Sequence, residues 1–109
     1  MITIDIHSNH ETVGDAIAML DSAIKLGRKD KDKLLCLIVG YGSKGTSHKI
    51  RSAVLEKLVE YKNNKYIKDY ILGSDLDIFN LNYQHFIGKE RISEAEKKNR
   101  NPGAIYISL

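Results

Sequence analysis

The first residues of the chain, MITIDIH, alternate between apolar and polar side chains. Ile2, Ile4 and Ile6 fall on one face of an extended chain and the polar residues between them fall on the other, which predicts a half-buried strand over residues 1–7. Further along, the run LLCLIV is apolar without interruption, as is typical of a strand covered on both faces. Its cysteine, Cys36, is the only one in the chain. We expect Cys36 in the core.

Two segments repeat apolar residues at helical spacing. The first follows Thr12, whose spacing to Asp15 resembles a capping box, and predicts a helix from about Thr12 to Leu26 that stops at Gly27. Its expected inner stripe consists of Val13, Ile17, Leu20 and Ile24. The second helix is expected to begin with Ser47 as its N-cap and to end near Lys62. Its expected inner stripe consists of Ile50, Val54, Leu58 and Tyr61.

The order of these elements predicts one α/β domain. A strand, a helix and a second strand at this length imply a parallel crossover connection. Residues 66–74, YIKDYILGS, predict a third strand, and residues 104–109, AIYISL, predict a last strand. Residues 75–101 are polar, and their aromatic side chains are spaced for a short helix or an ordered loop. With 109 residues in total, the chain has room for a single domain.

Composition and charge narrow the function classes only slightly. The content of 42% apolar and 28% charged residues is ordinary for a globular protein. Lys and Arg number 17 against 14 Asp and Glu, and the net charge of +3 is compatible with an anionic partner. A single cysteine excludes an internal disulfide. Because no signal-like or membrane-length apolar run occurs, we expect a cytoplasmic protein.

A Gly-x-Gly-x-x-Gly pattern, from Gly40 to Gly45, separates the second strand from the second helix. A dinucleotide-binding loop normally follows the first strand of a larger sheet and has an acidic residue about 20 positions further on, at the end of the next strand. Here the nearest acidic residues, Glu60 and Asp69, are expected in a helix and inside a strand. The Walker motif is also absent, because Lys44 precedes the last glycine. Both nucleotide-binding signatures are therefore disfavoured.

The loop nevertheless has features of a phosphate site. Glycines let the backbone approach a ligand, and a helix N-terminus offers N–H groups and a partial positive charge. The candidate phosphate-binding residues are Gly40, Tyr41, Gly42, Lys44, Gly45, His48, Lys49 and Arg51. Tyr41 could also stack on an unpaired base. The equally weighted alternative is a tight turn followed by a solvated basic helix face.

Asp5 and His7 form a second candidate site. Two residues apart on a strand, their side chains share a face, and they would meet the glycine loop at the carboxyl edge of a parallel sheet. An Asp-oriented His can act as general acid or base, or the pair could bind a divalent metal ion. The alternative is that both residues only tie down the end of the strand. His10 lies three positions after His7, a spacing that suits a metal site on a helix better than one on a strand.

In this order, the motifs resemble the Smr domain, the small MutS-related family. The segment IDIHS at Ile4–Ser8 is similar to the family's Leu-Asp-x-His, and VGYGSKGTSHKIRSAVLEKL is similar to its Gly-x-Gly turn and basic helix. The closing segment NPGAIYISL is similar to the family's final turn and strand. Val39 stands where the family carries His or Thr. Residues 75–101 look like an insertion relative to compact members.

The resemblance implies a two-layer α/β sandwich, similar to the C-terminal domain of translation initiation factor three, with a mixed sheet of about four strands and two main helices. Smr domains bind DNA or RNA, and several are endonucleases. Asp5 and His7 match the motif linked to cleavage, and Gly40 and Gly42 match the Gly-x-Gly. The expected partners are nucleic acid and a larger protein or the ribosome. Two alternatives remain, a non-catalytic nucleic-acid-binding or adaptor module and an enzyme acting on a small phosphate compound.

Overall fold

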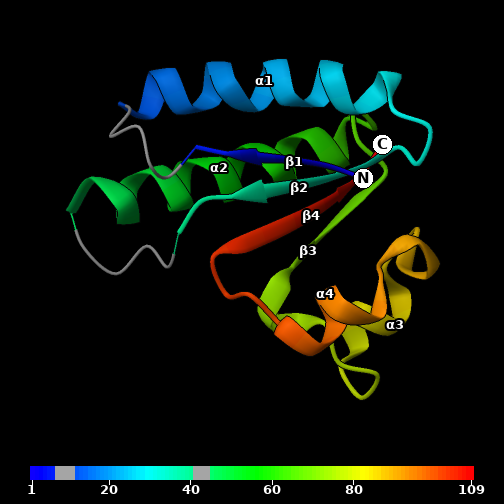
Figure 1. Cartoon of the computed structure of the whole chain (residues 1–109). Helices are drawn as coiled ribbons and strands as arrows, with labels where there is room; N and C mark the ends of the chain where they lie inside the picture. Colours follow the sequence, from blue (N-terminus) through cyan, green and yellow to red (C-terminus); the bar gives the residue numbers. More distant parts are fainter. Residues whose placement is uncertain (7–11, 41–44) are drawn as a thin grey trace.

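The sheet has four strands and mixed directions. The computed structural model describes residues 1–6, 12–40 and 45–109, without the side chains of 45–47. The strands are β1 (Ile2–Asp5), β2 (Leu34–Ile38), β3 (Asp69–Leu72) and β4 (Ala104–Ser108). Their order in the sheet is β1-β2-β4-β3, with β1 parallel to β2 and β4 antiparallel to both of its neighbours. The predicted α/β sandwich with a mixed sheet is confirmed (Figure 1).

Two long helices, α1 (Val13–Lys29) and α2 (Gly45–Asn63), cover one face of the sheet (Figure 1). The N-cap of α1 is confirmed, because the Thr12 hydroxyl accepts a hydrogen bond from the Asp15 N–H at 3.1 Å. The expected stop at Gly27 is wrong. Gly27 is buried inside α1, where a Cβ would lie 2.5 Å from Cδ1 of Leu109, so this glycine serves close packing rather than helix termination.

The second helix begins earlier than its sequence pattern predicts. It starts at Gly45, so Ser47 lies inside α2 and the prediction of an N-cap at Ser47 is wrong. The inner stripe is confirmed, with three buried residues, Ile50, Val54 and Leu58, and a half-buried Tyr61. In α1 the stripe fails only at its first position, because Val13 lies in the first turn and remains 38% exposed.

Apolar side chains are buried on both faces of the sheet. On the face covered by α1 and α2, the core includes Leu35, Leu37, Ile105 and Ile107 from the sheet and Leu20, Ile24, Val54 and Leu58 from the helices. On the opposite face, a second cluster includes Leu34, Cys36, Ile71 and Tyr106 from the sheet and Leu76, Tyr83, Phe86 and Ile92 from the chain between β3 and β4. This explains why every residue of β4 is buried, although its sequence alternates.

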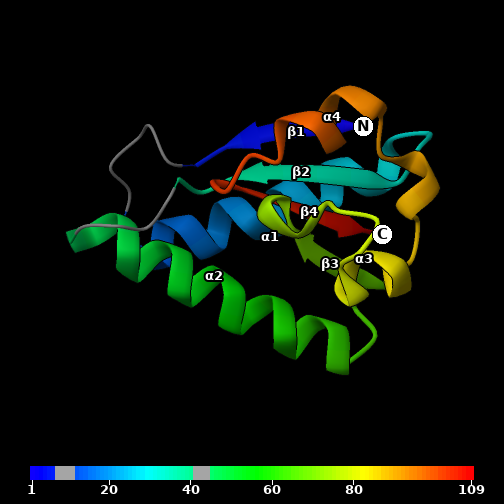
Figure 2. The same ribbon diagram turned by 90° about the horizontal axis from the view of Figure 1, so that it is seen from below.

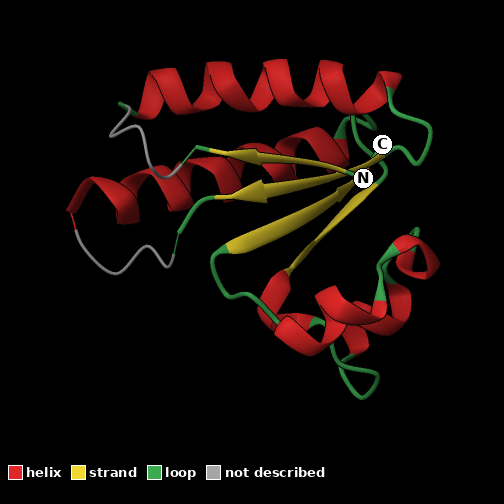
Figure 3. Ribbon diagram, in the orientation of Figure 1, coloured by secondary structure: helices red, strands yellow, loops and turns green. Residues whose placement is uncertain are grey.

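The chain between β3 and β4 folds into four short helices on the second face of the sheet (Figures 1 and 3). They are η1 (Gly73–Asp75), α3 (Leu81–His85), η2 (Lys89–Arg91) and α4 (Glu94–Asn99). Figure 2 shows α3 and α4 on the opposite side of the sheet from α1. The predicted third strand is therefore shorter than residues 66–74, since its last residues belong to η1.

Cys36 is buried in the second cluster, as predicted. Burial raises the pKa of its thiol to about 11. The hydroxyl of Tyr106, which is paired with Cys36 across β2 and β4, donates a hydrogen bond to the carboxylate of Glu96 in α4. This contact ties α4 to the centre of the sheet.

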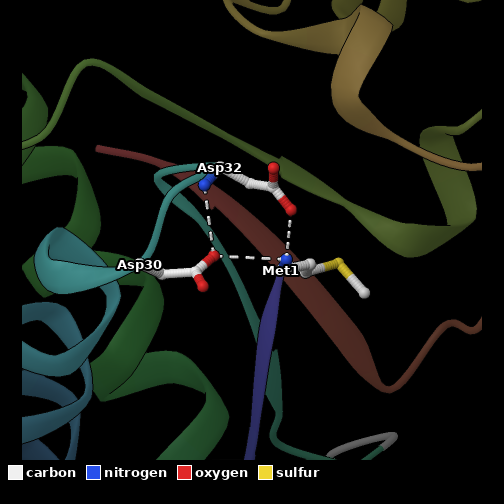
Figure 4. A network of polar contacts seen from close by, with 3 residues as sticks. All are labelled: Met1, Asp30 and Asp32. Atoms are coloured by element: carbon white, nitrogen blue, oxygen red, sulfur yellow. Dashed lines mark hydrogen bonds and ion pairs between the residues drawn. The ribbon is translucent and has the colours of Figure 1, made fainter.

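The amino edge of the sheet is held by charged groups (Figure 4). The amino group of Met1 donates to Asp32 at 2.6 Å and forms an ion pair with Asp30 at 3.2 Å. The hydrogen bond to Asp32 is the main cause of a raised pKa at the Met1 amine, and the same bond lowers the pKa of Asp32. These contacts fix the start of β1 beside the turn that leads into β2.

No helix in the described parts of the chain is long and apolar enough to cross a membrane.

Candidate functional site at the carboxyl edge of the sheet

Three chain segments meet at the carboxyl edge, which we define as the edge where β1 and β2 end and β4 begins (Figure 3). Asp5 lies beside Ile38 in the parallel register, and the Ile6 N–H donates to the Ile38 carbonyl at 3.0 Å. Ile38 in turn lies opposite Ala104, the first residue of β4. The end of β1 and the start of the glycine loop therefore converge as the sequence predicts.

Gly40 packs directly against the turn before β4. It is buried and has a φ of 74°, a backbone conformation that favours glycine. The Gly40 N–H donates to the Gly103 carbonyl at 3.2 Å, and a Cβ on Gly103 would lie 3.1 Å from the Gly40 Cα. The sequence predicts that Gly40 helps to bind phosphate. In this structure the Gly40 N–H and the missing side chain of Gly103 serve the contact between two backbone segments.

Val39 belongs to the hydrophobic core. Its side chain is 0% exposed and packs in the cluster beneath α1 and α2. The resemblance to Smr domains places Val39 at a position where the family carries His or Thr, which predicts that the site lacks a polar group here. Because the Val39 side chain points into the core, its role is packing, and it does not contribute to the surface of the candidate site.

Arg51 joins the two sides of the carboxyl edge. Its Nη1 donates to the Gly40 carbonyl at 3.3 Å and to the Pro102 carbonyl at 3.1 Å, and the side chain is half-buried. The sequence predicts a phosphate contact for Arg51. The structure shows instead that its guanidinium holds Gly40, after β2, against Pro102 in the turn before β4.

The first turns of α2 carry exposed basic groups at this edge. His48 and Lys49 are both exposed, and the first turn of α2 contains no acidic residue. The N-terminus of a helix also carries a partial positive charge, which adds to that of Lys49 and attracts anions. Of the predicted cationic residues that the structure describes, His48 and Lys49 are therefore better placed than Arg51 to reach a phosphate group.

Asp5 shares the edge with α2 but not the face of the sheet. Ile2 and Ile4 pack against the core under the long helices, so the alternation of β1 directs Asp5 to the opposite face. The packing of Ile38, which lies beside Asp5 in the sheet, supports this assignment, because Ile38 packs against the second cluster on that opposite face. Asp5 is exposed there. The plane of the sheet thus separates its carboxylate from the first turns of α2.

Several predicted residues lie outside the described parts of the chain. These are His7, His10, Tyr41, Gly42 and Lys44. The predicted Asp5–His7 pair and the middle of the glycine loop thus remain predictions. Among residues 1–6, 12–40 and 45–109, no group of three or more His, Cys, Asp or Glu side chains is arranged to hold a metal ion.

The contribution of residues 101–103 to this edge was missed by sequence reasoning. The Asn101 side chain accepts from the Gly103 N–H at 2.9 Å and shapes the turn that meets Gly40. The sequence identifies Pro102–Gly103 as a turn, but no local pattern links it to a residue about sixty positions earlier.

In comparisons with known proteins, no family model, curated protein or solved structure matches this chain.

Proposed function

We propose that this domain binds the phosphate backbone of DNA or RNA through the first turns of α2. The observation that carries the proposal is the pair of exposed residues His48 and Lys49 on a helix N-terminus that has no acidic residue in its first turn. Backbone phosphates are the anions that such a surface recognises without regard to sequence. Gly45 is the first residue of α2, and Lys44, a predicted phosphate contact, directly precedes it in the chain.

The rest of the carboxyl edge supports this surface. The two hydrogen bonds of Arg51 fix the start of α2 relative to the end of β2 and the start of β4. A fixed helix terminus keeps its N–H groups and cations in place before a ligand arrives, which reduces the entropy lost on binding. Binding to a nucleic-acid backbone is also what the resemblance to the Smr family implies. We propose that the protein acts in the cytoplasm, alone or beside a larger partner such as the ribosome.

Hydrolysis of the bound phosphodiester is a second candidate function. The observation that bears on it is that Asp5 ends β1 at the same edge as the proposed binding surface, so a nucleic-acid strand bound by α2 would have to cross this edge to reach the Asp5 carboxylate on the other face of the sheet. In this version, His7 would act as general acid or base and Asp5 would orient it. If the domain binds nucleic acid without cleaving it, the domain is a non-catalytic nucleic-acid-binding or adaptor module.

Binding can be tested with a matched pair of variants. Lys49→Glu changes an exposed lysine on α2, and Lys25→Glu makes the same change at an exposed lysine on α1. With labelled single- and double-stranded DNA and RNA, we expect Lys49→Glu to weaken binding about tenfold at low salt and to flatten its salt dependence, with about twofold or less for Lys25→Glu. Equal losses in both variants, or no affinity of the wild type, would refute the proposal.

Cleavage is tested on the same end-labelled substrates, with and without Mg²⁺. If the domain is an endonuclease, products form with the wild type and disappear in His7→Ala and Asp5→Asn, while both variants still bind. If every substrate stays intact over hours under conditions where binding is saturated, the domain is a binding module.

A further inference from the structure

An open cavity follows the free edge of β3. In the sheet order, β3 is the last strand and has only β4 as a neighbour. The cavity has a volume of about 450 Å³ and is bounded by α2 on one side and α3 on the other. We call it the β3 groove and define it by Leu55, Lys62, Tyr70, Leu72, Leu81 and His85.

The shape of the β3 groove favours an extended chain as its occupant. The edge of a strand presents backbone N–H and C=O groups for pairing. Leu55 of α2 and Leu81 of α3 face the cavity from opposite sides of this edge. Because successive side chains of a strand point in opposite directions, an added strand would direct them alternately toward Leu55 and toward Leu81.

Charges in the β3 groove favour an acidic residue at one end of that segment. The Asp69 carboxylate at this end is buried and already accepts hydrogen bonds from the N–H groups of Tyr70 at 2.9 Å and Ile87 at 3.0 Å. It also pairs with the Lys62 ammonium at 2.8 Å. The Lys62 side chain nevertheless remains 49% exposed, and His85 of the same cavity is exposed. Lys62 and His85 therefore offer hydrogen-bond donors at the start of β3, one of them cationic, whereas the other carboxylate that lines the cavity, that of Asp75, belongs to η1 beyond the end of β3.

Apolar side chains are also exposed in the chain segment around α3, which borders the β3 groove. Leu81 is 68% exposed, and Ile78, Phe79 and Ile87 in the same part of the chain are 64%, 83% and 50% exposed. Clustered exposed apolar residues rimmed by polar groups are typical of protein-binding surfaces. Leu81 lines the cavity, whereas Phe79 does not.

We propose that the β3 groove binds an extended segment of a partner protein, which pairs with β3 as an additional strand. Its apolar side chains lie against Leu55 and Leu81, and an acidic side chain at one end lies beside Lys62 and His85. Because the Tyr70 N–H is already bound by Asp69, backbone pairing uses the groups of β3 that follow it. This surface is separate from the first turns of α2, so the interaction does not depend on nucleic-acid binding.

The test uses a labelled peptide of alternating valine and threonine that ends in two glutamates. Two control peptides carry lysines at the same end or a proline at the centre, where it removes a backbone donor. We expect the glutamate peptide to bind at least tenfold more tightly than either control in fluorescence anisotropy. In NMR spectra, the amides of Ile71 and Leu72 should shift while those of His48 and Lys49 stay unchanged.

Matched variants locate the binding surface. Leu81→Glu places a repelling charge in the β3 groove and should lower affinity about tenfold or more, whereas Phe79→Glu adds the same charge outside the cavity and should change it less than about threefold. Circular dichroism and unfolding curves confirm that both variants fold. Equal binding of the proline peptide, equal effects of the two variants, or unchanged Ile71 and Leu72 amides at millimolar peptide would overturn the proposal.

Discussion

Arg51 links three parts of the chain through a single guanidinium group. It projects from α2 and donates to carbonyls of Gly40 and Pro102, which follow β2 and precede β4. Hydrogen bonds from a charged donor stabilise a fold more than neutral ones do, and the bond to Gly40 is partly buried. The basic residues near the glycine loop thus have different roles, with Arg51 stabilising the edge and the exposed Lys49 available to an anion.

This division of roles predicts different effects on stability. Arg51→Ala should lower the free energy of unfolding by about 1.5–3 kcal/mol, because it leaves the Gly40 and Pro102 carbonyls without this donor. Lys49→Ala, two residues earlier on the same helix, should change it by less than about 0.5 kcal/mol. Urea denaturation followed by circular dichroism measures both values. Equal stability of the two variants would mean that the Arg51 contacts contribute nothing measurable.

The end of β3 shows how an element boundary is set by its surroundings. The strand stops at Leu72 and the chain turns into η1 at Gly73. Gly73 is buried, and a Cβ at this position would lie 2.0 Å from the backbone carbonyl oxygen of Asn101. Because backbone atoms cannot move aside as the end of a side chain can, only glycine fits here.

Two glycine-to-alanine substitutions test this account. Gly73→Ala should destabilise the protein by about 3 kcal/mol or more, since the new methyl group displaces the turn before β4. Gly14→Ala in the first turn of α1 meets no atom closer than 3.9 Å, at Oγ1 of Thr12, and should stabilise it by up to about 1 kcal/mol. Thermal unfolding of the two variants should shift in opposite directions. A Gly73→Ala protein as stable as the wild type would contradict the packing described.

At the scale of the whole molecule, the chain between β3 and β4 is an integral part of the fold. The long helices cover one face of the sheet, and the side chains of Leu76, Tyr83, Phe86 and Ile92 cover the other. The sequence suggests that residues 75–101 are an insertion or a variable loop. Whatever the origin of the segment, its removal would expose Cys36, Ile71 and Tyr106, which pack against it.

The two phenylalanines of this segment provide a direct test. Phe86 is 3% exposed and Phe79 is 83% exposed. If the second cluster belongs to the same cooperative fold, Phe86→Ala should cost about 3–5 kcal/mol and the remaining unfolding should stay a single transition. Phe79→Ala should change stability by less than about 0.5 kcal/mol. A cost below about 1 kcal/mol for Phe86→Ala would show that the segment is only loosely attached.

Much of the local structure follows from the sequence alone. The alternation in residues 1–7, the apolar run of β2 and the helical stripes predict the elements in the correct order, because the periods of 2 and 3.6 residues are set by backbone geometry. The same holds for the N-cap at Thr12, which depends on residues three positions apart. That the end of β1 and Gly40 lie at one edge of the sheet also follows, since parallel strands end on the same side.

The tertiary structure decided what depends on distant residues. The position of β4 between β2 and β3, the cover over the second face, the hydrogen bond between Arg51 and Pro102 and the core position of Val39 all involve partners far apart in the chain. A local pattern describes only one side of such a contact. It identifies a basic or apolar residue, and the folded chain determines whether that residue meets a ligand, a carbonyl or the core.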